Sequence, residues 1–120
     1  MLYDPAVSSP DEVDKSPDYA HSVNVDAACR LASISAHIGA RYIHISTDMV
    51  FDGSKSPYRS TDMPNPLSIY GRSKTLGEEE VMKYPKGIAF RFATAFGVSP
   101  RLRLDLLVND LSYSAYNLYW

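Results

Sequence analysis

A helical pattern that stops just before an apolar strand is the feature that most constrains the fold. From Ala20 onward, apolar side chains recur at spacings of three and four, which predicts a one-faced helix that ends at Gly39. The run 42–45, YIHI, follows at once and is rich in the β-branched and aromatic residues that favour strands. A helix that leads so directly into an apolar strand is typical of a βαβ crossover, so the sequence predicts an α/β fold with a parallel sheet. The expected apolar stripe of this helix is Val23, Ala27, Leu31, Ile34 and Ile38.

Further elements are expected on both sides of this unit. Within the polar segment 1–19, the run 9–12, SPDE, can begin a short helix with an N-cap, a first-turn proline and a reciprocal glutamate. The pair Asn-Pro at 65–66 is expected to begin a longer helix that runs to about Tyr84. The run 88–93, IAFRFA, predicts a second strand.

The pattern continues toward the C-terminus. Ser99 and Pro100 are expected to open a last helix, with leucines 102, 106, 107 and 111 at helical spacing. The tail 112–120, SYSAYNLYW, carries no stop signal. The tail is therefore either the end of that helix or the result of a truncated reading frame.

Length and charge narrow the class of protein. A chain of 120 residues forms at most one domain, and its net charge of −2 with scattered Lys and Arg argues against nucleic acid as a partner. The single cysteine, Cys29, excludes an intrachain disulfide or a zinc cluster built from thiolates. With no secretory signal and no run of membrane-spanning length, we expect a soluble, cytoplasmic protein without a membrane partner.

Three residues have types and spacing that imply chemistry. Tyr70 and Lys74 lie four residues apart in the longer predicted helix, so both side chains leave one face. A protonated amine favours the phenolate and so lowers the pKa of a phenol, which suits proton exchange with a carbonyl or alcohol oxygen. Thr47, at the end of the first strand, can bring a hydroxyl to the same oxygen.

Other interpretations stay open for several polar residues. A Tyr-x-x-x-Lys pair alone is a weak motif in a chain with nine tyrosines. Gly71 and Gly77 weaken a helix, and they allow close approach of either a ligand or a neighbouring helix. Asp52 and Asp62 are expected to cap loop turns, and the run 78–80, EEE, is expected to be a solvated helix face. The three histidines are too irregularly spaced for a metal site, so no metal is expected, and His44 is expected to be a core residue. Arg101 and Arg103 could either contact a substrate diphosphate or lie on the surface without such a contact.

Three linked runs resemble a known superfamily. They are 46–53 (STDMVFDG), 64–67 (PNPL) and 70–78 (YGRSKTLGE). Together they resemble the extended short-chain dehydrogenases/reductases of the epimerase/dehydratase type, above all the dTDP-4-dehydrorhamnose reductase-like branch, which includes the regulatory β subunit of methionine adenosyltransferase. The resemblance implies a partial Rossmann-type (doubly wound) parallel sheet with flanking helices.

The resemblance also implies roles for individual residues. Tyr70 would be the general acid, Lys74 would hold the nicotinamide ribose and lower the Tyr70 pKa, and Thr47 would bind the reacting oxygen. Thr47 and Asp48 would contact a nucleotide-sugar substrate, and the strand and turn 91–97 would pass the nicotinamide of NAD or NADP. Met49 departs from the tyrosine usual in rhamnose-pathway reductases, and an aromatic expected near 94 is absent.

The glycine pattern sets a limit on this resemblance. The six glycines form no G-x-G-x-x-G run, so the pyrophosphate of a dinucleotide has no recognisable cradle. We therefore expect 1–120 to be a fragment, a single partial NAD(P)-binding domain holding the C-terminal half of the cofactor unit and the start of the substrate region. Two functions stay open, a nucleotide-sugar reductase or epimerase and a non-catalytic binding or regulatory protein. The expected partners are a nucleotide sugar and either a second copy or a chain that supplies the missing half.

Overall fold

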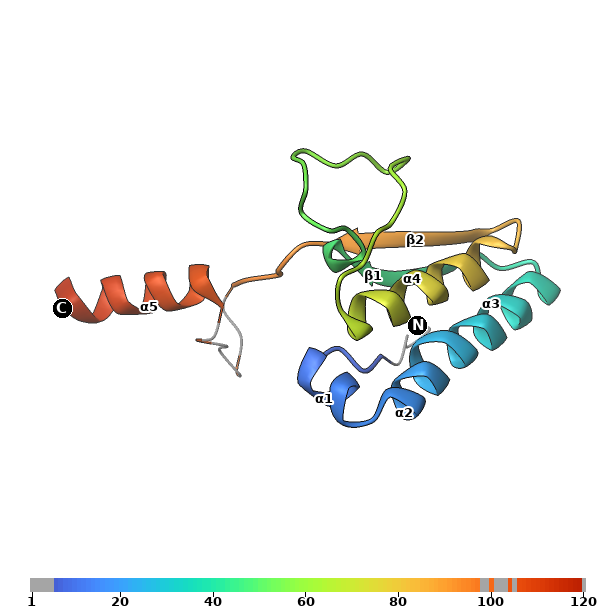
Figure 1. The fold of residues 1–120 in the computed structure, drawn as a ribbon, viewed down its shortest axis with the longest axis horizontal. Helices are drawn as coiled ribbons and strands as arrows, with labels where there is room; N and C mark the ends of the chain where they lie inside the picture. Colours follow the sequence, from blue (N-terminus) through green and yellow to red (C-terminus); the bar gives the residue numbers. More distant parts are fainter. Residues whose placement is uncertain (1–5, 98–99, 101–103, 105, 120) are drawn as a thin grey trace.

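The structure is a computed structural model that describes residues 6–97, 100, 104 and 106–119. Its helices and strands follow one another in an order that begins with helices, and Figure 1 shows their arrangement. In chain order they are α1 (Pro10–Lys15), α2 (Pro17–His21), the π-helical turn η1 (Ser22–Ala27), α3 (Ala28–His37), β1 (Tyr42–Thr47), the 3-10 turn η2 (Asp48–Val50), α4 (Ile69–Met82), β2 (Gly87–Phe92) and α5 (Leu107–Tyr119).

The two strands form a parallel sheet with helices on one face. β1 pairs with β2 in register from Tyr42 opposite Gly87 to Thr47 opposite Phe92. Side chains alternate along a strand, and Tyr42, His44 and Ser46 of β1 are buried on the side of α3 and α4. Thr47, the last residue of β1, is buried as well. The predicted parallel α/β arrangement is confirmed, and both strands begin or end within two residues of their predicted bounds.

The helix before β1 buries only part of the face that was predicted, since Val23 and Leu31 of the predicted stripe pack against the core. α2, η1 and α3 follow one another without a break, and the helix gives way to a left-handed glycine, Gly39, as expected. However, Ile34 and Ile38 of the predicted stripe are 58% and 69% exposed. The buried positions are the small residues Ala28, Ala32 and Ser35. Small side chains allow α3 to pack closely on α4 and β1, and the spacing of large apolar residues does not reveal that preference.

The helix that carries Tyr70 begins later than predicted. Ser68, not Asn65, is the N-cap of α4, and the Ser68 hydroxyl accepts a hydrogen bond of 3.0 Å from the Gly71 amide. Asn65 instead donates its side-chain amide to Asp52 in the preceding loop at 2.8 Å. The Asn-Pro pair therefore ends the loop, and the prediction that Pro66 is the first helical residue is wrong.

Gly71 and Gly77 of α4 allow close approach of other parts of the protein's own backbone, and not of a ligand. A Cβ on Gly71 would overlap the main-chain carbonyl oxygen of Met49 in η2. A Cβ on Gly77 would lie 2.5 Å from the carbonyl oxygen of Asn24 in η1. α4 therefore rests directly on the backbone of both turns, which offsets the low helix propensity of glycine.

The last helix stands apart from the rest of the chain. α5 begins at Leu107 and not at Pro100, and the predicted N-cap Ser99 and Leu102 lie outside the described residues. Figure 1 shows α5 beyond the end of β2, away from the layers formed by the other helices and the strands. Within the described ranges, no helix has the length and apolar character needed to cross a membrane.

The segment between η2 and α4 forms an arched loop around Asp52 (Figure 1). The Asp52 carboxylate accepts hydrogen bonds from the Tyr58 hydroxyl at 2.6 Å, the Ser54 amide at 2.9 Å and the Asn65 side chain at 2.8 Å. These bonds, that of Tyr58 above all, hold the pKa of Asp52 well below its usual range. Asp62 accepts a bond of 2.6 Å from the Arg59 amide. The predicted turn-capping role of both aspartates is confirmed.

We predict that Gly77→Ala destabilises the protein, although alanine is the better helix former by about 1 kcal/mol. The added methyl group has to displace the Asn24 carbonyl, and overpacking of this kind costs about 1–3 kcal/mol. Urea unfolding followed by circular dichroism measures the change. Ser33→Ala, at an exposed position of α3, is the control and should be neutral or slightly stabilising. A rise in stability for Gly77→Ala would contradict the backbone contact.

The loop gives a pH-dependent prediction for Asp52→Asn. Because the pKa of Asp52 is depressed in the folded state, its charge stabilises the fold above the unfolded pKa, near 3.8, and this contribution is lost as pH falls toward the folded pKa. The wild type should therefore exceed the variant in urea midpoint near neutral pH, and the difference should shrink below pH of about 4. Asp14→Asn on the exposed surface of α1 is the control. A difference that stays constant with pH would be inconsistent with the depressed pKa.

Candidate functional site

Thr47 lies where β1 ends and η2 begins. Its side-chain oxygen accepts a hydrogen bond of 3.2 Å from the Met49 amide, which caps η2. The same hydroxyl donates to Oδ1 of Asp48 at 3.2 Å. The end of β1 and the turn η2 thus fix the position of the Thr47 hydroxyl, and the residue as a whole is 8% exposed.

Tyr70 lies in the first turn of α4 and reaches the Thr47 hydroxyl. Its ring packs with Val7, Val13 and Ala20 in a buried cluster. Burial raises the pKa of the Tyr70 phenol above its usual value, while a hydrogen bond with Thr47 lowers it and the Asp48 carboxylate raises it. The sequence predicts that Lys74 lowers the pKa of the Tyr70 phenol. In the structure this pKa is raised instead, because loss of solvation disfavours the phenolate.

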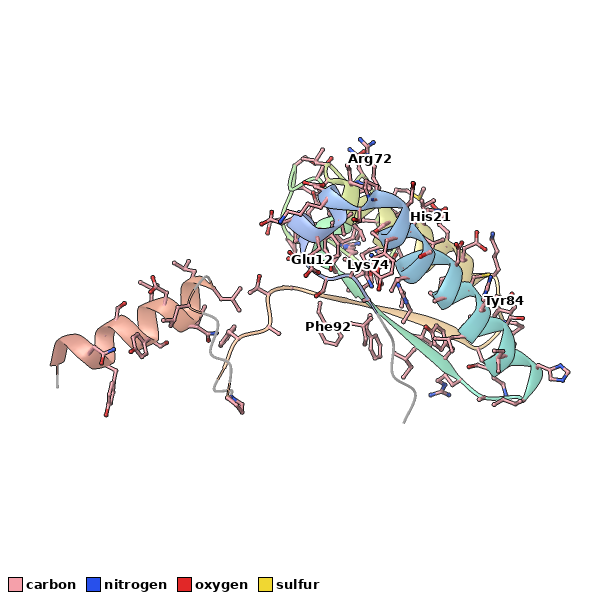
Figure 2. The ribbon with its side chains drawn as sticks, turned by 90° about the horizontal axis from the view of Figure 1, so that it is seen from below. Glu12, His21, Arg72, Lys74, Tyr84 and Phe92 are labelled. Carbon is pink, nitrogen blue, oxygen red and sulfur yellow. The ribbon has the colours of Figure 1, made fainter. Side chains whose placement is uncertain are left out.

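Lys74 follows one turn after Tyr70 on the same face of α4. Its side chain is only 2% exposed, and Figure 2 shows it in the middle of the body, between the helices and the strands. By contrast, Arg72 projects outward from the same helix in Figure 2. The structure therefore brings Thr47 and Tyr70 into contact, and it buries Lys74 one helical turn further along α4.

Asn24 holds this part of the molecule together, and sequence reasoning did not assign it to the site. It is 1% exposed and lies in η1, and π-helical turns are frequent at functional sites. Its Oδ1 accepts from the Val7 amide at 2.9 Å, and its Nδ2 donates to the Val7 carbonyl at 3.2 Å and to Ser73 Oγ at 3.0 Å. Ser73 Oγ in turn donates to the Tyr70 carbonyl at 2.8 Å. The available signal was an asparagine at a helical position flanked by valines.

A buried ion pair fixes the other end of α4. Glu78 receives a two-pronged contact from Arg91 of β2, with distances of 3.0 Å and 3.1 Å from Nε and 2.7 Å from a terminal nitrogen. The Arg91 guanidinium also lies 5.0 Å from the centre of the Phe51 ring. The predicted solvated face is wrong for Glu78, whose side chain is 6% exposed, because Arg91 neutralises it.

A cavity of about 1150 Å³ lies next to the three residues but not around them. It separates the arched loop from β2, and its lining includes Asp48 but not Thr47, Tyr70 or Lys74. Aromatic and charged side chains line the rest, namely Phe51, Tyr58, Phe90, Phe92, Asp52, Arg59, Glu78 and Arg91. Asp48 is therefore the link between the cavity and the Thr47 hydroxyl.

A metal centre is not found in the part of the chain that the structure describes. No group of three or more His, Cys, Asp and Glu side chains there is placed to hold an ion. His44 is 1% exposed and lies under α4, where Gly77 approaches its ring, as a core residue would. Arg101 and Arg103, for which a diphosphate contact and a surface role both stayed open, lie outside the described residues.

Comparisons with known sequences identify relatives. Residues 5–111 match the family described as the RmlD substrate binding domain. Methionine adenosyltransferase 2 subunit beta of Bos taurus is 47% identical over 94 residues, which are 78% of this chain and 28% of that protein. The spore coat polysaccharide biosynthesis protein SpsK of Bacillus subtilis is 48% identical over 75 residues, 62% of this chain and 26% of that protein. The chain thus spans about a quarter of the length of these relatives.

Solved structures agree with this assignment. A dTDP-4-dehydrorhamnose reductase from Bacillus anthracis in complex with NADP is 31% identical with a TM-score of 0.74, over 81% of this chain and 36% of that one. A UDP-glucuronic acid 4-epimerase from Bacillus cereus in complex with NAD is 32% identical with a TM-score of 0.60, over 82% and 33%. The fold is therefore part of a Rossmann-type α/β sheet, as predicted. The chain belongs to the RmlD substrate binding domain family, on the dTDP-4-dehydrorhamnose reductase-like branch of the extended short-chain dehydrogenases/reductases.

Proposed function

We propose that the chain supplies the proton-transfer part of an NAD(P)-dependent reductase or epimerase site that acts on a nucleotide sugar. One observation carries the proposal: Tyr70 contacts the Thr47 hydroxyl while Lys74 lies one helical turn away on the same face. The family and the NADP-bound and NAD-bound relatives support this reaction class.

The residues present fit one end of a dinucleotide. A phenol, a hydroxyl and an amine offer donors to a carbonyl oxygen and to ribose hydroxyls. They do not fit the pyrophosphate end, because Gly71 and Gly77 already lie against protein backbone and no glycine-rich turn occurs in the chain. We propose that contacts to the pyrophosphate come from residues outside these 120. In domain terms, 1–120 is then one partial cofactor-binding unit joined to the start of the substrate region.

In the proposed mechanism, Tyr70 is the general acid. Its raised pKa keeps the phenol protonated at neutral pH, as a proton donor must be. The Tyr70 hydroxyl would give its proton to the carbonyl oxygen of the sugar, and Thr47 would hold that oxygen through a second hydrogen bond. Lys74, when protonated, would stabilise the phenolate that remains and would contact the ribose. NAD(P)H, when bound, would supply the hydride for the carbonyl carbon.

The substrate side of the proposed site is at Asp48. This exposed carboxylate lines the cavity and accepts the hydrogen bond of Thr47. A volume of about 1150 Å³ is slightly above the usual range for ligand pockets, roughly 300–1,000 Å³, and leaves room for a molecule as large as a nucleotide sugar. Phe51 and Tyr58, stacked with 4.2 Å between ring centres, offer an apolar wall for its base.

We predict that Tyr70→Phe lowers kcat for reduction of dTDP-4-dehydrorhamnose by about 10²–10⁴-fold, because the variant lacks only the proton donor. NADPH oxidation, followed by absorbance in the longest native form of the protein, measures the change. Tyr84→Phe, in the turn that follows the C-terminal end of α4 and far from Tyr70, is the matched control and should retain wild-type kcat. Unchanged turnover in Tyr70→Phe would refute the assigned role.

A binding or regulatory function is the second candidate. It is favoured by the burial of Tyr70 and Lys74 under the chain's own residues, and by the 47% identity with methionine adenosyltransferase 2 subunit beta. In this case the chain would bind a methionine adenosyltransferase catalytic subunit, and the phenolic proton would have no part in binding.

This alternative predicts that Tyr70→Phe binds that catalytic subunit with the same dissociation constant as the wild type. Calorimetric titration of the two proteins measures it. Lack of association in both forms would exclude the regulatory function, whereas association together with absent reductase activity would favour it over the catalytic one.

A further inference from the structure

We infer that a column of two cations and two aromatic rings holds the arched loop against β2, which makes Arg91 a positioning residue of the proposed substrate cavity. In order along the column, the side chains are Lys55, Tyr58, Phe51 and Arg91. The first three belong to the loop and the last to β2. The effect of the column on a nucleotide sugar rests on the proposed function, whereas its effect on the loop does not.

The centre of the column is a pair of stacked rings. Phe51 and Tyr58 have 4.2 Å between ring centres and 11° between ring planes. Lys55 Nζ lies 5.5 Å from the centre of the Tyr58 ring, and the Arg91 guanidinium lies 5.0 Å from that of the Phe51 ring. Two rings so close leave no room for a side chain between them, so each cation lies on an outer face, where the π electrons attract it. The four groups therefore form one continuous column.

An acidic side chain holds the cation at each end of the column. The two-pronged contact of Arg91 with Glu78 has a shortest distance of 2.7 Å, and the Glu78 side chain is 6% exposed. Lys55 Nζ lies 2.9 Å from Asp62, but the Lys55 side chain is 54% exposed. A planar two-pronged pair shielded from water is stronger than an exposed lysine pair, which solvent screens. The stronger end of the column is therefore Arg91, and through it the loop is joined to α4 and β2.

Arg91 also reaches the loop beyond the column. Its Nη1 donates to the main-chain carbonyl oxygen of Ser60 at 3.5 Å. By contrast, the hydrogen bonds that the Asp52 carboxylate accepts are internal to the loop, so they shape the arch without joining it to the strand. Figure 1 shows the middle of the arch standing clear of the helices. The attachment of the arch to the sheet therefore depends on Arg91.

The column sets the distance between two walls of the cavity. Phe51 and Tyr58 line the cavity from the loop, and Glu78 and Arg91 line it from the other side. Because Arg91 contacts both walls, a nucleotide sugar meets a wall that is already in place. A wall that had to be ordered when the ligand binds would weaken affinity, since fixing side chains lowers their conformational entropy. The proton-transfer residues do not line the cavity, so we expect Arg91 to affect binding and not the chemical step.

Limited trypsin digestion tests whether the column holds the loop, because Lys55 and Arg59 offer cleavage sites within it. In the longest native form of the protein, Arg91→Lys and Phe51→Leu should each be cleaved at these sites at least about 10-fold faster than the wild type, since cleavage follows the population of molecules with a detached loop. Arg91→Lys keeps the charge but loses the planar fork, whereas Phe51→Leu removes a ring and leaves the ion pair intact. Mass spectrometry of the fragments measures the rates.

The control is Glu80→Gln, which removes the exposed ion pair with Lys83 at the end of α4 and leaves every trypsin site in place. This variant should be cleaved at the wild-type rate. Circular dichroism identifies the variants that remain folded. Cleavage of folded Arg91→Lys or folded Phe51→Leu at the wild-type rate would overturn the column.

Calorimetric titration with dTDP, the nucleotide part of the proposed substrate, tests the effect on the cavity. We expect the dTDP dissociation constant to rise about 10-fold in Arg91→Lys, as the ordering of one or two side chains on binding requires. KM for dTDP-4-dehydrorhamnose should rise by a similar factor at unchanged kcat, and Glu80→Gln should match the wild type in both. An effect of Arg91 on folding alone would instead lower kcat, through the fraction of active protein, and leave KM and the dissociation constant unchanged.

The possible outcomes separate the column from the proposed function. A wild type that does not bind dTDP would overturn the proposed function, and with it the role of Arg91 at the cavity, whereas faster cleavage of the variants would still support the column. A wild type that binds dTDP, together with an unchanged dissociation constant in Arg91→Lys, would overturn the positioning role while the proposed function stands.

Discussion

The direct contact of α4 with the backbone of two turns is the interaction on which the rest of the structure depends. At Gly71 and Gly77 the helix comes so close to η2 and η1 that no side chain fits between them. This contact sets the height of α4 above the sheet, and with it the positions of Tyr70 and Lys74 relative to the end of β1. The ion pair of Glu78 with Arg91 fixes the far end of the same helix, so α4 is held at both ends.

Much of the fold could be predicted from the sequence because its signals are local. The stop at Gly39 and the apolar run after it predicted a helix and a parallel strand, and the three linked motif runs predicted the superfamily. The buried face of α3 could not be predicted from hydrophobic periodicity, because its core positions are alanine and serine and the isoleucines lie outside. The start of α4 was misplaced since Asn65, a good N-cap by type, is bound to Asp52 instead.

The environment of the candidate site differs from the one expected from the sequence. The Tyr70 phenol contacts Thr47, because a strand end and the first turn of α4 determine where these two residues lie, and Lys74 is buried one turn further along α4. The direction of the Tyr70 pKa depends on burial by residues distant in sequence, among them Val7 and Val13, so no motif could have revealed it. The same holds for Asn24, whose partners lie 17 and 49 residues away.

The bonds of Asn24 to Val7 have a thermodynamic consequence for access to Tyr70. They fasten Val7, in the segment before α1, within the buried cluster that contains the Tyr70 ring. For a ligand that has to displace this segment, the apparent affinity is the intrinsic affinity reduced by the fraction of molecules in which the segment has moved away. A partner that held the segment away would then act as an activator without touching the reacting atoms.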